Sequence, residues 1–304
     1  MEKTSTKSKD ASNLRHPQKM YHHTEFPMQK QEAPGLHSKM NPIPDSGEES
    51  YIGHDRLKGR KALITGGDSG IGRAIAIAFA REGADVAINY LPEEQEDADS
   101  LADLLDKEGK PLYMIPGDIK DEDTCKKIVG SAHELLGGLD VLILNAAVQI
   151  AHEDITKITA EQIKHTFEVN VYPMFYLTKY AVPLLPEGSS IIFTASAEYY
   201  TPNKLLLDYA ASKSAVVALS IGLSKQLIDK GIRVNAVCPG PVWTPLEVSG
   251  GNPDEDIPAH GLDTPMKRSA QPVEMSGIYV FLASNESTYA TGEVFGLTGG
   301  LSGK

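Results

Sequence analysis

From Leu57 onward, short apolar runs alternate with longer amphipathic segments. The runs rich in Val, Ile and Leu predict strands near residues 61–65, 84–90, 111–117, 139–147, 189–196, 232–240 and 293–298. Helical spacing of apolar positions predicts helices over 71–83, 93–109, 121–138, 159–181, 208–230 and 272–283. The strand runs show no alternation of polar and apolar positions, which is typical of strands buried on both faces.

Strands and helices that alternate in this way form repeated βα units, which wind into an open parallel sheet. We therefore expect an α/β fold: a Rossmann-type, doubly wound parallel sheet of about seven strands with helices on both faces. No linker-like break interrupts residues 57–304. The pattern predicts a single domain over that range.

The first 56 residues do not show this alternation of apolar runs and amphipathic segments. Residues 1–20 are poor in aliphatic side chains, so we expect a disordered tail. Residues 21–56 carry spaced apolar positions, which predict an extended N-terminal arm on the surface of the domain or on a neighbouring subunit. A plain tail is the alternative. The apolar positions are Tyr21, Phe26, Met28, Leu36, Met40, Ile43 and Tyr51.

Charge and composition narrow the class of protein. The chain has 29 basic and 41 acidic residues, a net charge of −12, which argues against a nucleic acid or a membrane surface as the main partner. No apolar run is long enough to span a bilayer, and the first 20 residues do not read as a secretory signal. Cys125 and Cys238 form no disulfide framework, so a cytoplasmic location is expected. Histidine spacing predicts no metal site.

A glycine-rich turn follows the first predicted strand, in the stretch from Thr65 to Gly72 (TGGDSGIG). Glycines at such a place let the backbone approach a pyrophosphate, which then lies on the N-terminus of the following helix. The spacing differs from the G-x-G-x-x-G fingerprint, and a tight turn alone also requires glycine. The position after the first core strand favours dinucleotide binding.

Tyr209 and Lys213 lie four residues apart at the start of a predicted helix, so they share one helix face. A nearby ammonium favours the phenolate, and we expect it to lower the tyrosine pKa toward the working pH. Such a tyrosine can pass a proton to or from a carbonyl or alcohol oxygen. A solvated pair that occurs by chance is the alternative.

Further polar or glycine-containing features follow other predicted strands. Ser196 ends the fifth strand, Asn145 follows the fourth, and residues 239–244 (PGPVWT) follow the sixth. The carboxyl ends of parallel strands meet at one edge, where ligands bind in open α/β sheets. Asn170 lies in the preceding long helix, where an exposed polar face would also explain it. Together these features favour a site at that edge.

In these residues the chain resembles the short-chain dehydrogenase/reductase family over residues 57–304. Within it, the arm and the TGGDSGIG turn are similar to a branch of bacterial stress-associated oxidoreductases, NADPH-dependent aldehyde reductases and plant glucose and ribitol dehydrogenase homologues. The resemblance implies catalytic roles for four residues. Tyr209 would be the general acid/base, Lys213 would lower its pKa and hold the nicotinamide ribose, Ser196 would bind the substrate oxygen, and Asn170 would hold a water next to Lys213.

The resemblance also implies the set of residues that would hold the dinucleotide. These are the turn residues Thr65, Gly66, Ser69, Gly70, Ile71 and Gly72; Asn89 and Tyr90 after the second strand; Asp118 and Ile119; Asn145, Ala146 and Ala147; Tyr209 and Lys213; and Pro239, Gly240, Val242 and Thr244. Residues 245–268, rich in glycine and proline, would form a mobile lid over the substrate. Trp243, Tyr199 and Leu246 are candidate pocket walls, with core packing as the alternative.

Two departures from the family pattern stand out. Leu144–Ala147 replaces Asn-Asn-Ala-Gly after the fourth strand, which could change how the cofactor ribose is seated. Pro173 lies inside the long predicted helix, just after Asn170, and predicts a kink.

The choice between NAD and NADP stays open at this point. The end of the second strand offers Asn89 and Tyr90, neither acidic nor basic. Glu93 and Glu94 favour NAD slightly, since carboxylates repel the extra phosphate of NADP, and Arg73 is the only nearby candidate to bind that phosphate.

The expected function is that of an NAD(P)-dependent oxidoreductase acting on a small aldehyde, ketone or sugar-like polyol. A cofactor-binding regulator or scaffold with little turnover is the alternative, and a structural role through the arm is another. From the resemblance alone we expect a homo-oligomer, a homotetramer, and a role in the stress response. A monomer in size-exclusion chromatography with light scattering would contradict that assembly.

Overall fold

Seven strands of the computed structural model form one parallel sheet in the order β3-β2-β1-β4-β5-β6-β7. The structure describes residues 14–301. The strands are β1 Lys61–Thr65, β2 Asp85–Tyr90, β3 Leu112–Pro116, β4 Val141–Leu144, β5 Ser190–Thr194, β6 Arg233–Pro239 and β7 Val294–Leu297. The predicted Rossmann-type, doubly wound single domain is confirmed.

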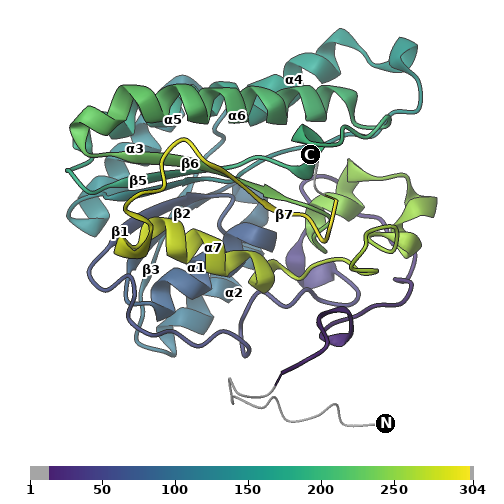
Figure 1. Ribbon diagram of the computed structural model, residues 1–304, viewed down its shortest axis with the longest axis horizontal. Helices are drawn as coiled ribbons and strands as arrows, with labels where there is room; N and C mark the ends of the chain where they lie inside the picture. The colour runs from purple at the N-terminus through teal and green to yellow at the C-terminus, as the bar shows by residue number, and fades with distance from the viewer. Residues whose placement is uncertain (1–13, 302–304) are drawn as a thin grey trace.

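Helices cover both faces of the sheet (Figure 1). One face carries α1 Gly70–Arg81, α2 Gln95–Asp106 and α7 Pro272–Ala283. The other carries α3 Glu122–Leu136, α4 Ala160–Asn170, α5 Tyr172–Ala181 and α6 Leu207–Leu227. Each face has its own apolar core, one under α1 and α7 and one under α3, α5 and α6. The apolar strand runs are buried between them, as their lack of alternation predicted.

The order of the strands across the sheet changes direction between β1 and β4: β2 and β3 follow on one side of β1, and β4 to β7 follow on the other. These two strands pair directly, with Ala62 opposite Val141, although β2 and β3 come between them in the sequence. Crossovers on the two sides of this point go to opposite faces of the sheet, which leaves a crevice at the carboxyl ends of the strands. The fold thus brings the polar loop residues after β1, β4, β5 and β6 to one edge.

The helix predicted over 159–181 is two helices. The break lies at Val171, whose φ of −120° and ψ of −54° depart from helical values. Pro173 was expected to kink a continuous helix; it lies instead in the first turn of α5, where its missing N–H has no intrahelical partner to lose. The interruption therefore precedes the proline by two residues.

The N-terminal arm, residues 21–56, lies along its own domain without joining the sheet. In Figure 1 it passes from the lid, residues 245–268, to the side of α1 and α2. The expected tail, residues 1–20, lies outside the described residues up to residue 13; Pro17–Lys19 forms a 3-10 turn, and Arg268 Nε donates to the Pro17 carbonyl at 3.0 Å. Contact with the domain thus begins before residue 21.

The lid contains two short helical turns, Glu247–Gly251 and Asp254–Ala259. Among residues 14–301, no helix is both long and apolar enough to cross a membrane. Within the same range, no group of three or more His, Cys, Asp or Glu side chains is placed to hold a metal ion.

Candidate active site

A cavity of about 820 Å³ opens at the carboxyl edge of the sheet. It extends from the glycine turn to Tyr209 and Lys213 and is bordered by the lid. Most residues predicted for the site line it: Gly66, Ser69, Gly70, Ile71, Asn89, Tyr90, Asp118, Ile119, Asn145, Ala146, Ala147, Ser196, Tyr209, Lys213, Pro239, Gly240, Val242 and Thr244. The structure therefore brings together residues that lie as much as 178 positions apart, from Gly66 to Thr244.

Thr65 and Gly72 lie behind the wall of the cavity. The Thr65 hydroxyl accepts hydrogen bonds from the N–H groups of Asn145 (2.9 Å) and Ala146 (3.2 Å). Gly72 packs directly on the Gly66 carbonyl, where a Cβ would collide. Both residues hold the wall in shape, and neither is part of its surface.

Asn170, the last residue of α4, is also outside the cavity lining and fully buried. Its Oδ1 accepts from the Val148 N–H at 2.8 Å, and its Nδ2 donates to the Val148 carbonyl at 2.8 Å and to Ser212 Oγ at 3.0 Å. The side chain thus joins the segment after β4 to α6, which carries Tyr209.

The glycine turn presents bare backbone to the cavity. Gly66 and Gly70 have φ of +60° and +50°, in the left-handed region that glycine tolerates best. A Cβ on Gly70 would lie 3.2 Å from Thr244, on the opposite wall. Ser69 precedes α1 and makes no side-chain capping bond, so the first N–H groups of α1 have no cap from that residue. This arrangement suits an anionic group such as a pyrophosphate.

Tyr209, Lys213 and Ser196 meet at the other end of the cavity. Tyr209 lies in the first turn of α6, and its hydroxyl is close enough to Ser196, in the loop after β5, for that side chain to lower its pKa. Lys213, one turn further along α6, is buried and donates from Nζ to the Thr194 carbonyl at 2.8 Å. Its ammonium lies 5.6 Å from the centre of the Tyr209 ring.

The expectation that Lys213 lowers the Tyr209 pKa is wrong for this geometry. Burial raises the pKa of the Tyr209 phenol well above its usual value; the Ser196 hydrogen bond opposes this, and the carboxylates of Glu247 and Glu198 reinforce it. Burial also lowers the pKa of Lys213 to about 8. Burial is the largest cause of both pKa shifts, because it disfavours the charged form of each group. The phenol is therefore protonated at neutral pH.

Two carboxyl groups line the cavity near the end of β2, that of the buried Asp68 and that of the half-buried Glu94. Burial raises the pKa of Asp68 to about 6, and burial together with the charge of Asp68 raises the pKa of Glu94 to about 8. Arg73, the residue considered for a phosphate, points away from this wall: its guanidinium donates to Glu48 Oε1 at 2.9 Å and to Ser100 Oγ at 3.1 Å. Asp68 and Glu94 therefore line this end of the cavity, whereas Arg73 does not.

The lid contributes a carboxylate that motif spacing did not indicate. Glu247 Oε2 lies 2.6 Å from Asn252 Nδ2 and 3.3 Å from both Gln149 Nε2 and His260 Nε2. All four residues line the cavity, as does Glu198. No local motif could have identified the group around Glu247, because Gln149 comes from the loop after β4, whereas Asn252 and His260 come from the lid.

Of the three candidate pocket walls, only Leu246 lines the cavity. Tyr199 is 38% exposed, and Trp243 is fully buried beneath the arm. A contribution from the arm was also missed: Ala33, Pro34 and Gly35 form part of the cavity wall.

Comparison with known proteins identifies the family to which the chain belongs. Residues 66–302 match the sequence model of the family described as Enoyl-(Acyl carrier protein) reductase. The Bacillus subtilis protein named Uncharacterized oxidoreductase YhxD is 57% identical, over 95% of this chain and 98% of its own. The Glucose and ribitol dehydrogenase of Daucus carota is 43% identical, over 91% of this chain and 97% of its own.

Solved structures agree with the sequence relatives. A short chain dehydrogenase from Burkholderia cenocepacia, crystallised in complex with NADP, superposes with a TM-score of 0.75 at 31% identity. The match covers 81% of this chain and 99% of that structure. With this fold, this cavity and these relatives, the chain belongs to the short-chain dehydrogenase/reductase family of oxidoreductases.

Proposed function

We propose that the protein is an NAD(P)-dependent oxidoreductase that transfers a hydride between nicotinamide and a small carbonyl or alcohol substrate. The observation that carries this proposal is the convergence of Ser196, Tyr209 and Lys213 in one cavity with the glycine turn. A proton donor next to a dinucleotide site is the minimum that such a reaction requires.

The residues present fit a dinucleotide. The bare turn at Gly66 and Gly70 and the start of α1 suit the pyrophosphate, and the cavity volume of about 820 Å³ is in the range of ligand sites. Lys213, at the far end, would hold the nicotinamide ribose. When bound, the nicotinamide supplies or accepts the hydride.

The protein's own contribution is to position and protonate the substrate. Ser196 and Tyr209 present two hydroxyl groups to one substrate oxygen, and the raised pKa of Tyr209 keeps its proton available to a carbonyl at neutral pH. Asn170, through Val148 and Ser212, fixes α6 relative to the segment after β4. Reduction of a carbonyl uses the protonated phenol and oxidation of an alcohol uses the phenolate, so the oxidation is promoted by higher pH.

We propose NAD(H) as the preferred cofactor, on the charge of two side chains that line the cavity near the end of β2. Asp68 and Glu94 line the cavity close to the end of β2, next to which this fold binds the adenine ribose, and carboxylates there would repel a 2′-phosphate. Arg73 is bound to Glu48 and other groups of the domain. The Burkholderia cenocepacia structure contains NADP, so the two proteins are expected to differ at this end of the site.

A small, uncharged, hydroxyl-bearing substrate fits the other end. Glu198 and Glu247 repel anions, and Gln149, Asn252 and His260 add hydrogen-bonding groups around Glu247. The name of the Daucus carota relative refers to a sugar and a polyol, which agrees with this chemistry.

The decisive experiment measures NADH and NADPH oxidation with a panel of short aldehydes, ketones and sugars, for the wild type and for Tyr209→Phe. Loss of the phenolic proton is expected to lower kcat by about 10²- to 10⁴-fold. Cofactor affinity should change little, since the ring remains. Tyr289→Phe, at a fully exposed tyrosine, is the matched control. Turnover that survives in Tyr209→Phe would contradict the assignment, and tight cofactor binding without any turnover would favour a regulatory protein.

A further inference from the structure

The N-terminal arm is stacked on the base of the lid. Phe26 lies face to face with Trp243, with ring centres 3.7 Å apart and planes inclined by 3°. Trp243 is fully buried, and its Nε1 donates to the Pro42 carbonyl at 2.8 Å. One aromatic residue next to the lid is thus enclosed by two parts of the arm.

Backbone hydrogen bonds continue this contact into the lid itself. The Phe26 N–H donates to the Pro258 carbonyl at 3.0 Å, and the Gln31 N–H donates to the Val248 carbonyl at 2.8 Å. A small apolar core, separate from the two cores of the sheet, lies between arm and lid. Its members are Phe26, Met40, Trp243, Val248 and Ile257.

Where the arm reaches the cavity, its residue Gly35 contacts Pro245, at the start of the lid and next to the glycine turn. A Cβ on Gly35 would lie 2.9 Å from the Pro245 carbonyl, and a Cβ on Gly70 would lie 3.8 Å from Pro245 Cδ. Pro245 is therefore enclosed between the arm on one side and the glycine turn on the other. Ala33, Pro34 and Gly35 themselves line the cavity, so the arm is part of its wall.

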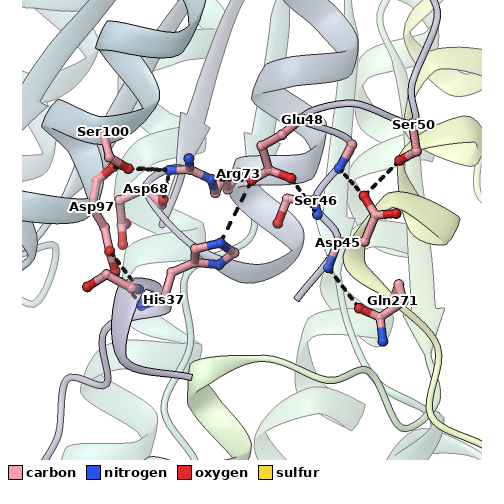
Figure 2. A network of polar contacts seen from close by, with 12 residues as sticks. His37, Asp45, Ser46, Glu48, Ser50, Asp68, Arg73, Asp97, Ser100 and Gln271 are labelled. Atoms are coloured by element: carbon pink, nitrogen blue, oxygen red, sulfur yellow. Dashed lines mark hydrogen bonds and ion pairs between the residues drawn. The ribbon is translucent and has the colours of Figure 1, made fainter. Parts of the chain in front are cut away.

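A buried polar network ties the same part of the arm to the helices that carry the turn (Figure 2). Asp97 of α2 accepts the backbone N–H of His37 at 2.5 Å, and Glu48 accepts from Arg73 of α1 at 2.9 Å. Arg73 also donates to the Asp68 carbonyl, in the glycine turn, at 3.3 Å. Figure 2 shows these groups converging from the arm, the turn and both helices.

The family fold exists without such an arm. The match to the family's sequence model covers residues 66–302, which omits the arm and also β1. The Burkholderia cenocepacia structure matches over 99% of its length while covering 81% of this chain, so about a fifth of this chain has no counterpart in it. The Bacillus subtilis relative, by contrast, aligns over 95% of this chain and so shares most of the arm. The arm is therefore an addition to a fold that already forms the sheet and the site.

We propose that the N-terminal arm is a component of the dinucleotide site: Ala33–Gly35 forms its outer wall, and Phe26, stacked on Trp243, holds the lid against the glycine turn and slows release of the cofactor. The inference rests on the proposed cofactor but not on any particular substrate. The part of the dinucleotide concerned is the pyrophosphate that joins its two halves, which would lie next to Gly70 and Pro245.

The test is the rate at which bound NADH leaves the full-length protein. The enzyme is loaded with NADH and mixed with excess NAD⁺ in a stopped-flow instrument, and the loss of NADH fluorescence gives the dissociation rate. Phe26→Ala removes the stack, so the dissociation rate and the Kd are expected to rise roughly tenfold, with little change in the association rate. Met28→Ala, at an arm residue that is 67% exposed, is the matched control and should remain within about twofold of the wild type.

A folded Phe26→Ala protein whose NADH dissociation rate stays within twofold of the wild type would overturn the proposal. So would an equal increase in Met28→Ala. If Phe26→Ala does not fold by circular dichroism, Phe26→Leu, which keeps an apolar side chain and loses the stack, is judged by the same criterion. A wild type that binds neither NADH nor NADPH would instead refute the proposed function, before any variant is compared.

Discussion

Asp68 and Glu94 have carboxyl groups that remain partly protonated near neutral pH. Neither carboxylate oxygen of Asp68 accepts a hydrogen bond of good geometry, although Ser69 lies close enough to lower its pKa. Burial sets the direction of both shifts. The charge of Asp97 raises the pKa of Asp68 further, and the charges of Asp68 and Asp97 raise that of Glu94. The charge at this end of the cavity therefore depends on pH in the range where enzymes are assayed.

This pH dependence predicts a difference between the affinities of NADH and NADPH. A raised pKa means that each group is neutral below it and ionised above it, so negative charge increases as pH rises through about 6 for Asp68 and about 8 for Glu94. Between pH 7 and 9 the Kd of NADPH should increase more steeply than that of NADH, since only NADPH carries the 2′-phosphate. Fluorescence titrations of both cofactors over this range measure the difference.

Glu94→Gln is the informative variant, because it removes the charge and keeps the shape. It should flatten the NADPH curve above pH 7 and leave the NADH curve nearly unchanged. Parallel curves for the two cofactors in the wild type would show that neither carboxyl group faces the adenine ribose.

At the scale of single residues, spacing along the chain predicted the site residues that belong to short motifs. The glycine turn, Ser196, Tyr209 and Lys213 were identified from short motifs, and the structure places all of them on one cavity. The pKa of Tyr209 was not predictable, since it depends on burial and on Glu247, which folding brings from the lid.

The junction between α4 and α5 shows how one side chain defines the end of an element. Asn170 satisfies both backbone groups of Val148, and a continuous helix through Pro173 would bring the proline ring against the carbonyl of Val169. The apolar periodicity of residues 159–181 reflects neither the Asn170 hydrogen bonds nor the clash of the proline ring, so it predicted one continuous helix. Where no such tertiary bond intervened, as in α1 and α7, the predicted bounds agree with the observed ones within two residues.

Asn170→Ala should destabilise the protein by about 1–3 kcal/mol, because it leaves the buried N–H and carbonyl of Val148 without partners. Urea unfolding followed by circular dichroism gives the change in the free energy of unfolding. Pro173→Ala, three residues away in the first turn of α5, should change it by less than about 1 kcal/mol. If Pro173→Ala were the more damaging of the two, the proline and not the asparagine would define the junction.

At the scale of the whole molecule, the arm is fastened at its far end as well as at the lid. Glu82, after α1, has a fully buried side chain that accepts from Arg56 Nη2 at 2.7 Å, from the Tyr51 hydroxyl at 2.6 Å and from the His54 N–H at 2.8 Å. Burial alone would raise the pKa of Glu82, but these hydrogen bonds outweigh it and hold the pKa at about 2. The course of the arm could not be predicted, since an extended chain has no periodicity to indicate which surface it covers.

Glu82→Gln should lower the free energy of unfolding by roughly 3 kcal/mol at pH 7, because Arg56 loses its buried partner. A lowered pKa contributes stability above the ordinary value of 4.5, and this contribution is lost as pH falls toward about 2. The variant should therefore lose less stability than the wild type between pH 4.5 and 2 in denaturant titrations. Glu168→Gln, in an exposed pair with Lys164, is the control and should cost less than about 0.5 kcal/mol.

Trp243 is the only tryptophan in the chain. Its indole is stacked on the Phe26 ring and hydrogen-bonded to the Pro42 carbonyl, so its environment depends on the arm. Intrinsic fluorescence therefore acts as a built-in optical reporter: blue-shifted emission when the arm is seated, and red-shifted, solvent-quenchable emission when it is not. The protein needs no attached dye for arm movement to be followed in real time during turnover.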